Sequence, residues 1–552
     1  MAKKSKYTDW TKEDLIKRVD ALEKRKKYGL VWDEERTKEK FEADAEGKLP
    51  VLKEVKSKEV KTDPGQPTHI LIEGDNFHAL SVLAYTHERS IDVIYIDPPY
   101  NTGARDWKYN NNYVDENDPY RHSKWLSMMY KRLRIAKRLL KKNGVLIVTI
   151  DDHELFGLLG LLESLNAKSL GRVAICIKPE GRRQSKYIME AHEYAFFVTW
   201  GDPTMRGLNV DFGLDFPERD AISEFRWEGL MRRDAPREDR GSDYWYAFYA
   251  YENGEVSVEP SKGGVEVWPV NTKGIERVWL WDRQRASENL SELQAVIRKG
   301  KPTVYYKRRK QGRIKPTSFW YGSKYNANAY GTRLLTYILP DNDFDFPKSL
   351  YSVIDCIDLF LPPNGLVLDF FAGSGTTGHA ALALNNEDQG NRKFILCTNN
   401  ENNICTGVCY PRMERVIKGC QSDNGSEISA LGGNLKYYRT TFVPSEPTDR
   451  NKELLTKEAV EMLCLRENTF DLVSENSTIK IYSNKYRYTA IIFDQLAIPK
   501  FKKTASKFDK PVSVYVFSLG DDDFADEFAD MKTVKVCSIP EAILRVYRRI
   551  FQ

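Results

Sequence analysis

The sequence lacks a long apolar run. No segment approaches the roughly 18 consecutive apolar residues that a membrane-spanning helix needs. The first residues, Met-Ala-Lys-Lys-Ser-Lys, also lack the apolar stretch of a secretory signal peptide. We therefore expect a cytoplasmic protein that has no membrane partner.

Cysteine is scarce, with 8 residues in a chain of 552. That is too few for a disulfide framework in a chain of this length. Four of them lie close together in the sequence: Cys397, Cys405, Cys409 and Cys420. They include no Cys-x-x-Cys pair and have no suitably spaced histidine, whereas structural zinc sites use such spacings. We therefore expect free thiols and no metal ion.

No charge of one sign dominates, since the formal net charge is only +5. Global charge therefore favours neither nucleic acid nor a membrane surface as a partner. With 41% hydrophobic and 30% charged residues, the composition is that of a folded chain with substantial cores. The length predicts roughly three to four domains.

What the sequence does contain is an alternation of apolar strands and helices. Short runs rich in β-branched residues predict buried parallel strands at 91–96, 145–150, 366–368 and 393–397. Helical periodicity appears at 125–142 and 377–384. Strands that alternate with helices predict an α/β fold with a mostly parallel sheet.

Changes of composition divide the chain into five expected parts. A Pro-Gly-Gln-Pro cluster follows a Lys- and Glu-rich region, and a stretch rich in Arg, Trp and Tyr later interrupts the α/β pattern. The parts are a helical N-terminal region at 1–62, the first half of an α/β core at 63–204, an insertion at 205–330, the second half of the core at 331–435 and a mixed α/β C-terminal domain at 436–552.

The first chemical motif is a tetrapeptide directly after the strand at 91–96. It reads Asp97, Pro98, Pro99 and Tyr100. Ligands bind at the carboxyl ends of the strands in open α/β sheets, so this position suits a site. Two prolines fix the backbone and can present a carboxylate, a carbonyl oxygen and an aromatic ring together. A plain turn is the alternative, because short motifs also occur by chance.

A carboxylate, a carbonyl oxygen and an aromatic ring in one loop suit methylation of an exocyclic amine on a nucleobase. The lone pair of the amine is delocalised into the ring, so the amine is a poor nucleophile. Hydrogen bonds from its two N–H groups to Asp97 and to the Pro98 carbonyl would strengthen as positive charge develops on nitrogen. Tyr100 can stack on the base, which must be flipped out of a duplex to reach the loop.

The second motif is a glycine-rich turn between the strand at 366–368 and the helix at 377–384. It reads Asp369-Phe370-Phe371-Ala372-Gly373-Ser374-Gly375-Thr376-Thr377. Small residues let a ligand approach the backbone closely. The turn lacks the Gly-Lys-Ser/Thr ending of a Walker A loop and the full three-glycine spacing of a dinucleotide fingerprint. We therefore expect a cofactor loop of another kind.

Together the motifs resemble those of amino-methyltransferases that use S-adenosyl-L-methionine. The Asp-Pro-Pro-Tyr motif precedes the cofactor loop, an order similar to that of the beta class. Asp-Pro-Pro-Tyr-Asn-Thr-Gly at 97–103 resembles the modification subunits of type III restriction-modification systems. The resemblance implies a Rossmann-like methyltransferase sheet, split by a target-recognition domain, in a prokaryotic protein. It also implies adenine-specific DNA methylation in a restriction-modification or phage-defence system.

The resemblance also assigns roles to single residues. The segment at 72–76 resembles one near the adenine of the cofactor, and Lys348 would pair with the cofactor's methionine carboxylate. His192-Glu193-Tyr194 resembles a pocket motif. No acidic residue directly follows the strand at 393–397, so the ribose contact is left open. The implied cofactor-binding residues are Asp75, Lys348, Asp369, Phe371, Ala372, Gly373, Ser374, Gly375 and Thr376.

The insertion at 205–330 lies where this class carries its target-recognition region. Arginine can contact phosphates or guanine edges, and aromatic rings can stack on displaced bases. The alternative is that the aromatic residues form the domain's own core and the charges its solvated surface. The candidate DNA-binding residues are Arg232, Arg233, Arg237, Lys307, Arg308 and Arg309.

The expected partners are double-stranded DNA and, by resemblance, a second copy of the chain and a helicase-nuclease restriction subunit. Asp97, in place of serine, favours adenine over cytosine as the target. Two alternatives stay open. One is methylation of the cytosine 4-amino group or of RNA. The other is a specificity subunit that mainly binds DNA for a nuclease-helicase partner.

Overall fold

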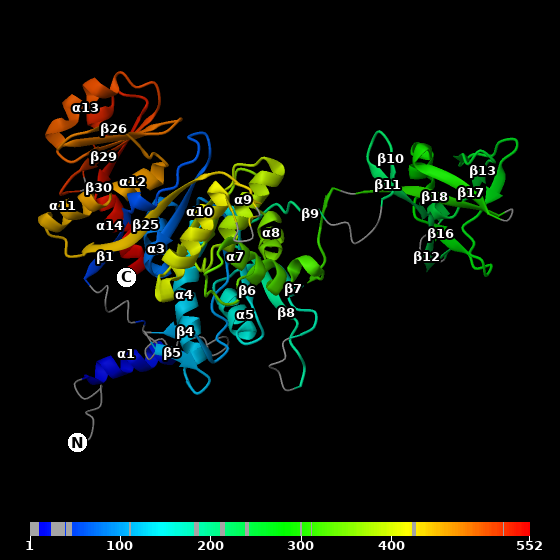
Figure 1. The fold of residues 1–552 in the computed structure, drawn as a ribbon, viewed down its shortest axis with the longest axis horizontal. Coiled ribbons are helices and arrows are strands. Elements are labelled where there is room, and N and C mark those ends of the chain that lie inside the picture. The colour runs from blue at the N-terminus through cyan, green and yellow to red at the C-terminus, as the bar shows by residue number, and fades with distance from the viewer. Residues whose placement is uncertain are drawn as a thin grey trace. The chain divides into compact units, whose positions relative to one another are not determined.

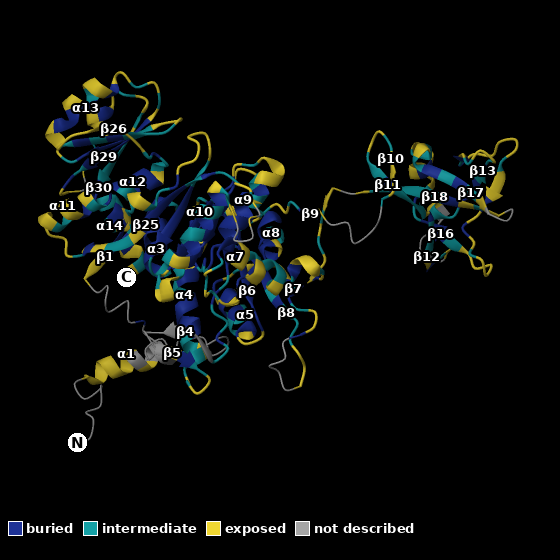
Figure 2. Cartoon of the chain, in the orientation of Figure 1, coloured by how far each residue is buried: buried dark blue, intermediate teal, exposed yellow. Residues whose placement is uncertain are grey.

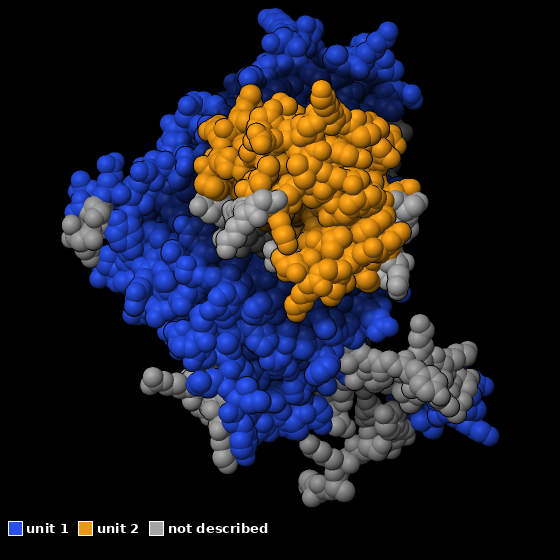
Figure 3. Space-filling model, turned by 90° about the vertical axis from the view of Figure 1, so that its right-hand side faces the viewer, with its two compact units in different colours: residues 1–206, 317–552 blue, residues 207–316 orange. Residues whose placement is uncertain are grey.

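The computed structural model describes residues 10–23, 32, 39, 47–109, 112–181, 187–209, 216–237, 242–298, 301–310, 312–421, 425, 427–520, 522 and 524–551. The chain forms two compact units, which Figure 3 draws in different colours. The first comprises residues 1–206 and 317–552, and the second comprises residues 207–316. Among the described helices, none is long and apolar enough to cross a membrane.

A ten-stranded sheet is the centre of the first unit (Figure 1). Its strands are β1 (Lys48–Glu54), β2 (Thr68–Glu73), β3 (Ile91–Ile96), β6 (Leu140–Ile150), β7 (Lys168–Cys176), β8 (His192–Thr199), β20 (Phe319–Trp320), β21 (Leu366–Asp369), β22 (Lys393–Thr398) and β25 (Asn434–Pro444). They are ordered β1-β25-β2-β22-β21-β3-β6-β8-β7-β20. From β25 to β6 all neighbours are parallel, whereas β8 is antiparallel to both β6 and β7. This mostly parallel, Rossmann-like sheet confirms the expected fold class.

Two groups of helices pack beside the sheet. The first group is α3 (Asn76–Thr86), α4 (Arg121–Leu139) and α5 (Leu155–Ser164), and the second is α7 (Arg333–Ile338), α8 (Leu350–Asp358), α9 (Thr376–Asp388) and α10 (Tyr410–Lys418). Every residue of β3 is buried, as Figure 2 shows by the dark centre of the unit. Buried parallel strands have this continuous apolar pattern, because helices cover their faces.

The four expected strands fall within β3, β6, β21 and β22, and the expected helices fall on α4 and α9. One bound differs. The helix expected at 125–142 ends at Leu139, because Leu140 is extended and begins β6. Smaller elements of the unit are α1 (Lys12–Glu23), the hairpin β4 (Ala104–Tyr109) and β5 (Asn112–Asp115), and the pair β23 (Cys420–Gln421) and β24 (Glu427–Ile428).

The C-terminal segment adds a five-stranded sheet to the first unit. Its elements are α11 (Asp449–Glu458), α12 (Val460–Glu467), β26 (Asp471–Glu475), β27 (Ile479–Ser483), β28 (Tyr488–Ile492), α13 (Ile498–Ala505), β29 (Val512–Phe517), β30 (Val534–Ile539) and α14 (Glu541–Phe551). Helices α12 and α14 pack on α3 of the core. The boundary expected at 435/436 falls inside β25, which pairs with β1 and β2 of the large sheet.

The second unit is made mainly of β-strands. It contains β9 (Leu208–Asn209), β10 (Glu218–Arg219), β11 (Glu224–Gly229), β12 (Met231–Pro236), β13 (Phe248–Ala250), β14 (Val256–Ser257), β15 (Val265–Val267), β16 (Arg277–Trp279), α6 (Arg283–Glu288), β17 (Leu293–Arg298), β18 (Lys301–Arg309) and β19 (Arg313–Ile314). Its core includes Tyr246, Phe248, Trp279 and Trp281. Several aromatic residues of this segment therefore stabilise the unit itself.

Candidate active site

The two chemical motifs leave the same edge of the large sheet. Strand β3 ends at Ile96 and leads into Asp97, while β21 ends at Asp369. The two strands are parallel neighbours, with Val367 opposite Val93 and Leu368 opposite Ile94. Neighbouring parallel strands place their carboxyl ends side by side, which is where open α/β sheets bind ligands. The fold therefore brings the motifs together across the long insertion.

The carboxylate of Asp97 uses its two oxygens differently. Oδ1 accepts a hydrogen bond of 2.6 Å from the Thr149 hydroxyl, which belongs to β6. The ammonium group of Lys348 lies 3.1 Å from the same oxygen. Among the described residues, none donates a hydrogen bond to Oδ2. One oxygen is thus held by the protein, and the other can accept a hydrogen bond from a substrate.

Lys348 is the centre of a buried charge network. Its Nζ lies 2.7 Å from Glu193 Oε2, 4.4 Å from the centre of the Tyr100 ring, and in hydrogen-bond contact with the Tyr100 hydroxyl. Burial lowers the pKa of Lys348, but the carboxylates of Asp97 and Glu193 outweigh burial and raise it above its usual value. The resemblance implied a pairing with the methionine carboxylate of the cofactor. Here the ammonium already lies between two protein carboxylates, and that pairing stays a prediction.

Tyr100 is fixed at its hydroxyl end. The hydroxyl donates a 3.0 Å hydrogen bond to Glu193 Oε2, and Glu193 is itself buried in β8. Burial raises the pKa of Tyr100 well above its usual value, and the nearby charges of Asp97 and Glu193 raise it further. The phenol therefore stays protonated and serves as a donor and an aromatic surface.

The two prolines present one engaged and one available carbonyl group. The indole Nε1 of Trp125, a fully buried residue of α4, donates a 2.7 Å hydrogen bond to the Pro99 carbonyl. No donor among the described residues reaches the Pro98 carbonyl. The turn continues through Asn101, which is buried, has a φ of 59° and donates to the Glu154 carboxylate. The backbone of the loop is thus held from both sides.

Asp369 organises the start of the cofactor loop. Its two oxygens accept hydrogen bonds from the Phe371 amide at 2.9 Å and from the Thr377 hydroxyl at 2.6 Å. Burial raises the pKa of Asp369 to about 7, although both hydrogen bonds act in the opposite direction. The Asp369 side chain therefore fixes the turn by hydrogen bonds to residues at its two ends, Phe371 and Thr377.

Two glycines shape the turn itself. Gly373 has a φ of 51° and Gly375 a φ of 82°, conformations that residues with a side chain rarely adopt. The Gly375 amide donates a 2.7 Å hydrogen bond to the Ala372 carbonyl, which closes the turn. A Cβ atom at Gly375 would lie 3.2 Å from Cys409 Sγ, and one at Gly373 would lie 3.4 Å from the Phe344 ring. The segment that carries Lys348 thus borders the glycine turn.

Ser374 and Thr376 contact an arginine that sequence patterns did not reveal. Arg412 of α10 is fully buried, and its guanidinium donates to the Ser374 hydroxyl at 3.1 Å and the Thr376 hydroxyl at 2.9 Å. No described carboxylate forms an ion pair with it, and burial lowers its pKa to about 10. Arg412 therefore holds the cofactor loop in place, and the hydroxyls of Ser374 and Thr376 accept its hydrogen bonds.

The start of α3 also touches the cofactor loop. The side chain of Asp75 caps α3 by accepting a 2.8 Å hydrogen bond from the Phe77 amide. Its other oxygen lies 3.4 Å from Arg132. The neighbouring Asn76 side chain donates a 2.9 Å hydrogen bond to the Phe370 carbonyl. The resemblance at 72–76 therefore falls on residues that lie against the second motif.

In the second unit, the described side chains of the candidate DNA-binding residues all have acidic partners. Arg232 lies 3.4 Å from Asp234, and Arg237 lies 2.8 Å from Glu276. Asp220 pairs with two cations, Lys307 at 2.9 Å and Arg309 at 2.8 Å. Arg308 lies 3.0 Å from Glu228. The side chain of Arg233 is outside the described residues. These cations already have partners within the unit, so DNA contact by the same cations stays a prediction.

The eight cysteines are free thiols, as expected, and six of them are buried: Cys176, Cys356, Cys397, Cys405, Cys409 and Cys464. Burial raises the pKa of Cys409, which packs against the glycine turn, well above its usual value. Within the described part of the chain, no three histidine, cysteine or acidic residues are grouped as metal ligands.

Several known proteins are similar to this chain. The family model described as DNA methylase matches residues 91–407. The type II methyltransferase M.KpnI of Klebsiella pneumoniae is 34% identical over 378 residues, which are 67% of this chain and 90% of that protein. The probable type III restriction-modification enzyme HindVI Mod subunit of Haemophilus influenzae is 40% identical over 475 residues, which are 75% of this chain and 59% of that subunit.

A further relative is the type III restriction-modification enzyme EcoPI Mod subunit of Escherichia phage P1. It is 28% identical over 391 residues, which are 64% of this chain and 60% of that subunit. The chain thus spans most of the length of M.KpnI but only about three fifths of the two Mod subunits.

Proposed function

The chain belongs to the DNA methylase family, whose members transfer a methyl group from S-adenosyl-L-methionine to DNA, and we propose that it methylates the 6-amino group of adenine in double-stranded DNA. Asp97, Pro98, Pro99 and Tyr100 form the catalytic loop in this proposal. The matched region, 91–407, includes both this loop and the glycine turn.

The observation that carries the proposal is the pair of available acceptors in the catalytic loop. Asp97 Oδ1 is held by Thr149 and Lys348, and the Pro99 carbonyl is held by Trp125. Asp97 Oδ2 and the Pro98 carbonyl receive no hydrogen bond from the described residues. An exocyclic amine has two N–H groups, and these two acceptors can receive them.

These contacts favour the transition state over the bound substrate. As the amine nitrogen bonds to the methyl carbon, the nitrogen becomes more tetrahedral and gains positive charge. Hydrogen bonds from its N–H groups to a carboxylate and a carbonyl strengthen with that charge. Asp97 Oδ2 can then accept the proton that the amine loses. Because Thr149 and Lys348 already fix Oδ1, the carboxylate needs little reorganisation during the reaction.

The glycine turn fits S-adenosyl-L-methionine as a ligand. Positive φ values at Gly373 and Gly375 leave backbone exposed where a Cβ would otherwise project. Phe371 and Ala372 complete the turn that would hold the cofactor, which supplies an electrophilic methyl group on a sulfonium when bound. Asp369, Ser374 and Thr376 act indirectly, because their polar atoms are bonded to other parts of the turn or to Arg412.

The target base must leave the helix to reach the loop, because an amine inside a duplex is inaccessible to a side chain. Tyr100 would stack on the flipped base, because its hydroxyl end is already held by Lys348 and Glu193. The unit at 207–316 is proposed to select the DNA sequence. By its likeness to Mod subunits the chain would act as a homodimer, with a helicase-nuclease restriction subunit as partner in a phage-defence system.

Mass spectrometry of DNA treated with the protein and S-adenosyl-L-methionine tests the choice of base. The expected product in the nucleoside digest is N6-methyl-2′-deoxyadenosine, formed only with the cofactor present. Treated RNA should stay unmodified. Finding N4-methylcytosine alone, or modified RNA alone, would show that the catalytic loop acts on a different amine.

A further inference from the structure

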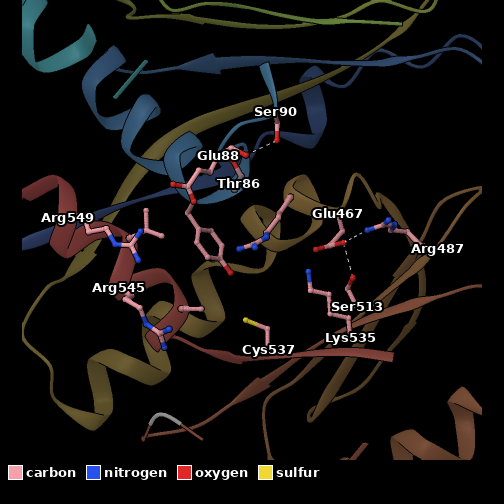
Figure 4. Close-up of a pocket in the computed structure, with 14 residues that line it drawn as sticks. Thr86, Glu88, Ser90, Glu467, Arg487, Ser513, Lys535, Cys537, Arg545 and Arg549 are labelled. Atoms are coloured by element: carbon pink, nitrogen blue, oxygen red, sulfur yellow. Dashed lines mark hydrogen bonds and ion pairs between the residues drawn. The ribbon is translucent and has the colours of Figure 1, made fainter. Parts of the chain in front are cut away.

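A basic hollow lies in the first unit, at the junction of α3 with the C-terminal segment (Figure 4). Its volume is about 470 Å³, which is within the usual range of small-molecule sites. The loop after α3 contributes Glu88, and the C-terminal segment contributes the rest of the charged lining. None of these residues belongs to the catalytic loop or to the glycine turn.

Cations outnumber anions in this lining. The positively charged side chains are Arg466, Arg487, Lys535, Arg545 and Arg549, while the negatively charged ones are Glu88 and Glu467. A concave surface lined by one sign of charge concentrates its field and attracts ions of the opposite sign. The lining therefore favours an anion.

Both carboxylates already have cationic partners. Glu467 accepts hydrogen bonds from Arg487 at 2.6 Å and from Ser513 at 2.8 Å. Glu88 lies 3.5 Å from Arg138, which is not part of the lining. Lys535 and Arg549, in contrast, form no ion pair with any described carboxylate. The net field in the hollow is therefore positive.

Helix α14 presents its arginines from a rigid support. Arg545 and Arg549 are four residues apart, so they share one face of the helix. The opposite side is anchored by buried Ile543 and by Tyr547, whose hydroxyl donates a 2.6 Å hydrogen bond to the Pro50 carbonyl of β1. Figure 4 shows Arg545 and Arg549 on one side of the hollow and Lys535 with Ser513 on another. Like charges at this spacing destabilise a helix, and a bound anion would offset that cost.

We propose that this hollow binds a small polyphosphate, either inorganic or as part of a nucleotide. Guanidinium groups match phosphate oxygens with paired hydrogen bonds, and lysine adds a point charge. The hydroxyls of Ser90 and Ser513 in the lining already donate to the Glu88 carbonyl and to Glu467, so the cations carry the recognition. The size of the hollow suits a small molecule, which disfavours the backbone of a DNA duplex as the occupant.

Calorimetric titration of the full chain tests the proposal. Inorganic tripolyphosphate is the first probe, ATP the second and a non-target DNA duplex the third, all with S-adenosylhomocysteine present to fill the cofactor site. The double variant Arg545→Gln/Arg549→Gln is compared with Arg548→Gln. Arg548 lies on the same helix but pairs with Glu541 at 2.5 Å outside the hollow.

The wild type and Arg548→Gln should each bind one tripolyphosphate. The double variant should bind it at least about tenfold more weakly, because it loses charge-assisted hydrogen bonds to the anion. Duplex binding and methylation should be unchanged. Lys535→Gln gives an independent check, with weaker binding expected. No binding by the wild type, an equal loss in Arg548→Gln, or a parallel loss of duplex binding in the double variant would overturn the proposal.

Discussion

At Lys348 one ammonium group meets two carboxylates and a phenol of the catalytic loop. Asp97 and Tyr100 belong to the catalytic loop and Glu193 to β8, far from it in the sequence, and all three contact its Nζ. A buried lysine would lose its proton more easily, but the two carboxylates raise its pKa instead. The ammonium beside Asp97 therefore keeps its positive charge at neutral pH.

Replacing Lys348 with methionine should slow methyl transfer by about 100-fold, the loss typical of a removed electrostatic contact in a site. Asp97 Oδ1 would keep only Thr149, and Glu193 would lose its cation. Single-turnover methylation measures the rate, and calorimetry measures cofactor affinity, which should change little. Lys324→Met is the matched control, because Lys324 pairs with Asp355 at the half-exposed surface.

A loss of cofactor affinity in Lys348→Met would instead support the role that the family resemblance implies for Lys348. If Lys348 binds the methionine carboxylate of the cofactor, the variant would bind S-adenosyl-L-methionine much more weakly and transfer methyl groups at a nearly normal rate when saturated. Because removing one partner of a buried pair also destabilises a fold, the double variant Lys348→Met/Glu193→Gln is measured in parallel.

Asp369 predicts a pH dependence of stability. Its pKa is about 7 in the folded protein, whereas the ordinary pKa of an aspartate side chain is 3.8. Between these values the folded carboxyl keeps a proton that the unfolded one has lost, so stability falls as the pH rises through this window. Asp369→Asn should remove this contribution, which is a few kcal/mol at most, since one pKa unit corresponds to about 1.4 kcal/mol.

Urea unfolding at about pH 5 and about pH 8 measures this effect. The loss of unfolding free energy between the two pH values should be smaller in Asp369→Asn than in the wild type. An equal loss in both proteins would mean that Asp369 is ionised throughout and that another group causes the change.

Residue types at strand ends could be recognised from the sequence, but their partners could not. Asp97 and Asp369 each follow a short apolar run, and this can be recognised in the local sequence pattern. Thr149, Trp125 and Arg412 give no such signal, because each acts through a contact between distant segments. A buried arginine in particular looks like any other charge on an amphipathic helix such as α10.

At the scale of elements, buried parallel strands were the most predictable feature. Strand β3 was expected at its observed bounds, because its sequence is largely apolar and β-branched. The edges of the sheet were harder to foresee. Strands β1 and β25 mix charged and apolar residues, and they join the core sheet through the parallel pairing of β25 with β2 and the antiparallel pairing of β1 with β25. The sequence boundary at 435/436 could not anticipate that pairing.

The glycine turn between β21 and α9 gives a prediction at this scale. Gly375→Ala should destabilise the protein by about 1 kcal/mol or more, because alanine is strained at a φ of 82° and its Cβ would crowd Cys409. It should also weaken binding of S-adenosyl-L-methionine. Thermal unfolding and cofactor titration measure the two effects.

Gly407→Ala is the control for this substitution. Its added Cβ would make only an ordinary 3.5 Å contact, with Asn403, and its φ lies outside the positive range. If both variants lose the same stability and cofactor affinity, the turn at Gly375 has no special conformational role.

At the scale of the molecule, an autonomous β-unit is inserted into the methyltransferase fold. Its two ends lie side by side, since Asn209 of β9 pairs with Arg313 of β19. It also has its own hydrophobic core. Composition predicted such an insertion at 205–330, but the exact division at 207 and 316 depends on contacts that only the structure contains.

Replacing residues 210–312 with a short Gly-Ser linker should leave the first unit folded. The variant should bind S-adenosyl-L-methionine as the wild type does, because both motifs lie in the first unit. It should lose site-specific DNA methylation. Calorimetry and long-read detection of modified bases check the two results, and site-specific methylation by the shortened chain would place target recognition elsewhere.

Methyl transfer by Asp97→Ala tests the catalytic role of Asp97 directly. Tritiated S-adenosyl-L-methionine and target DNA are mixed with the wild type or the variant, and cofactor binding is measured on the same samples. We predict no detectable transfer by Asp97→Ala, with cofactor affinity close to that of the wild type. Methylation retained by the variant would contradict the assignment of Asp97 as the catalytic acceptor.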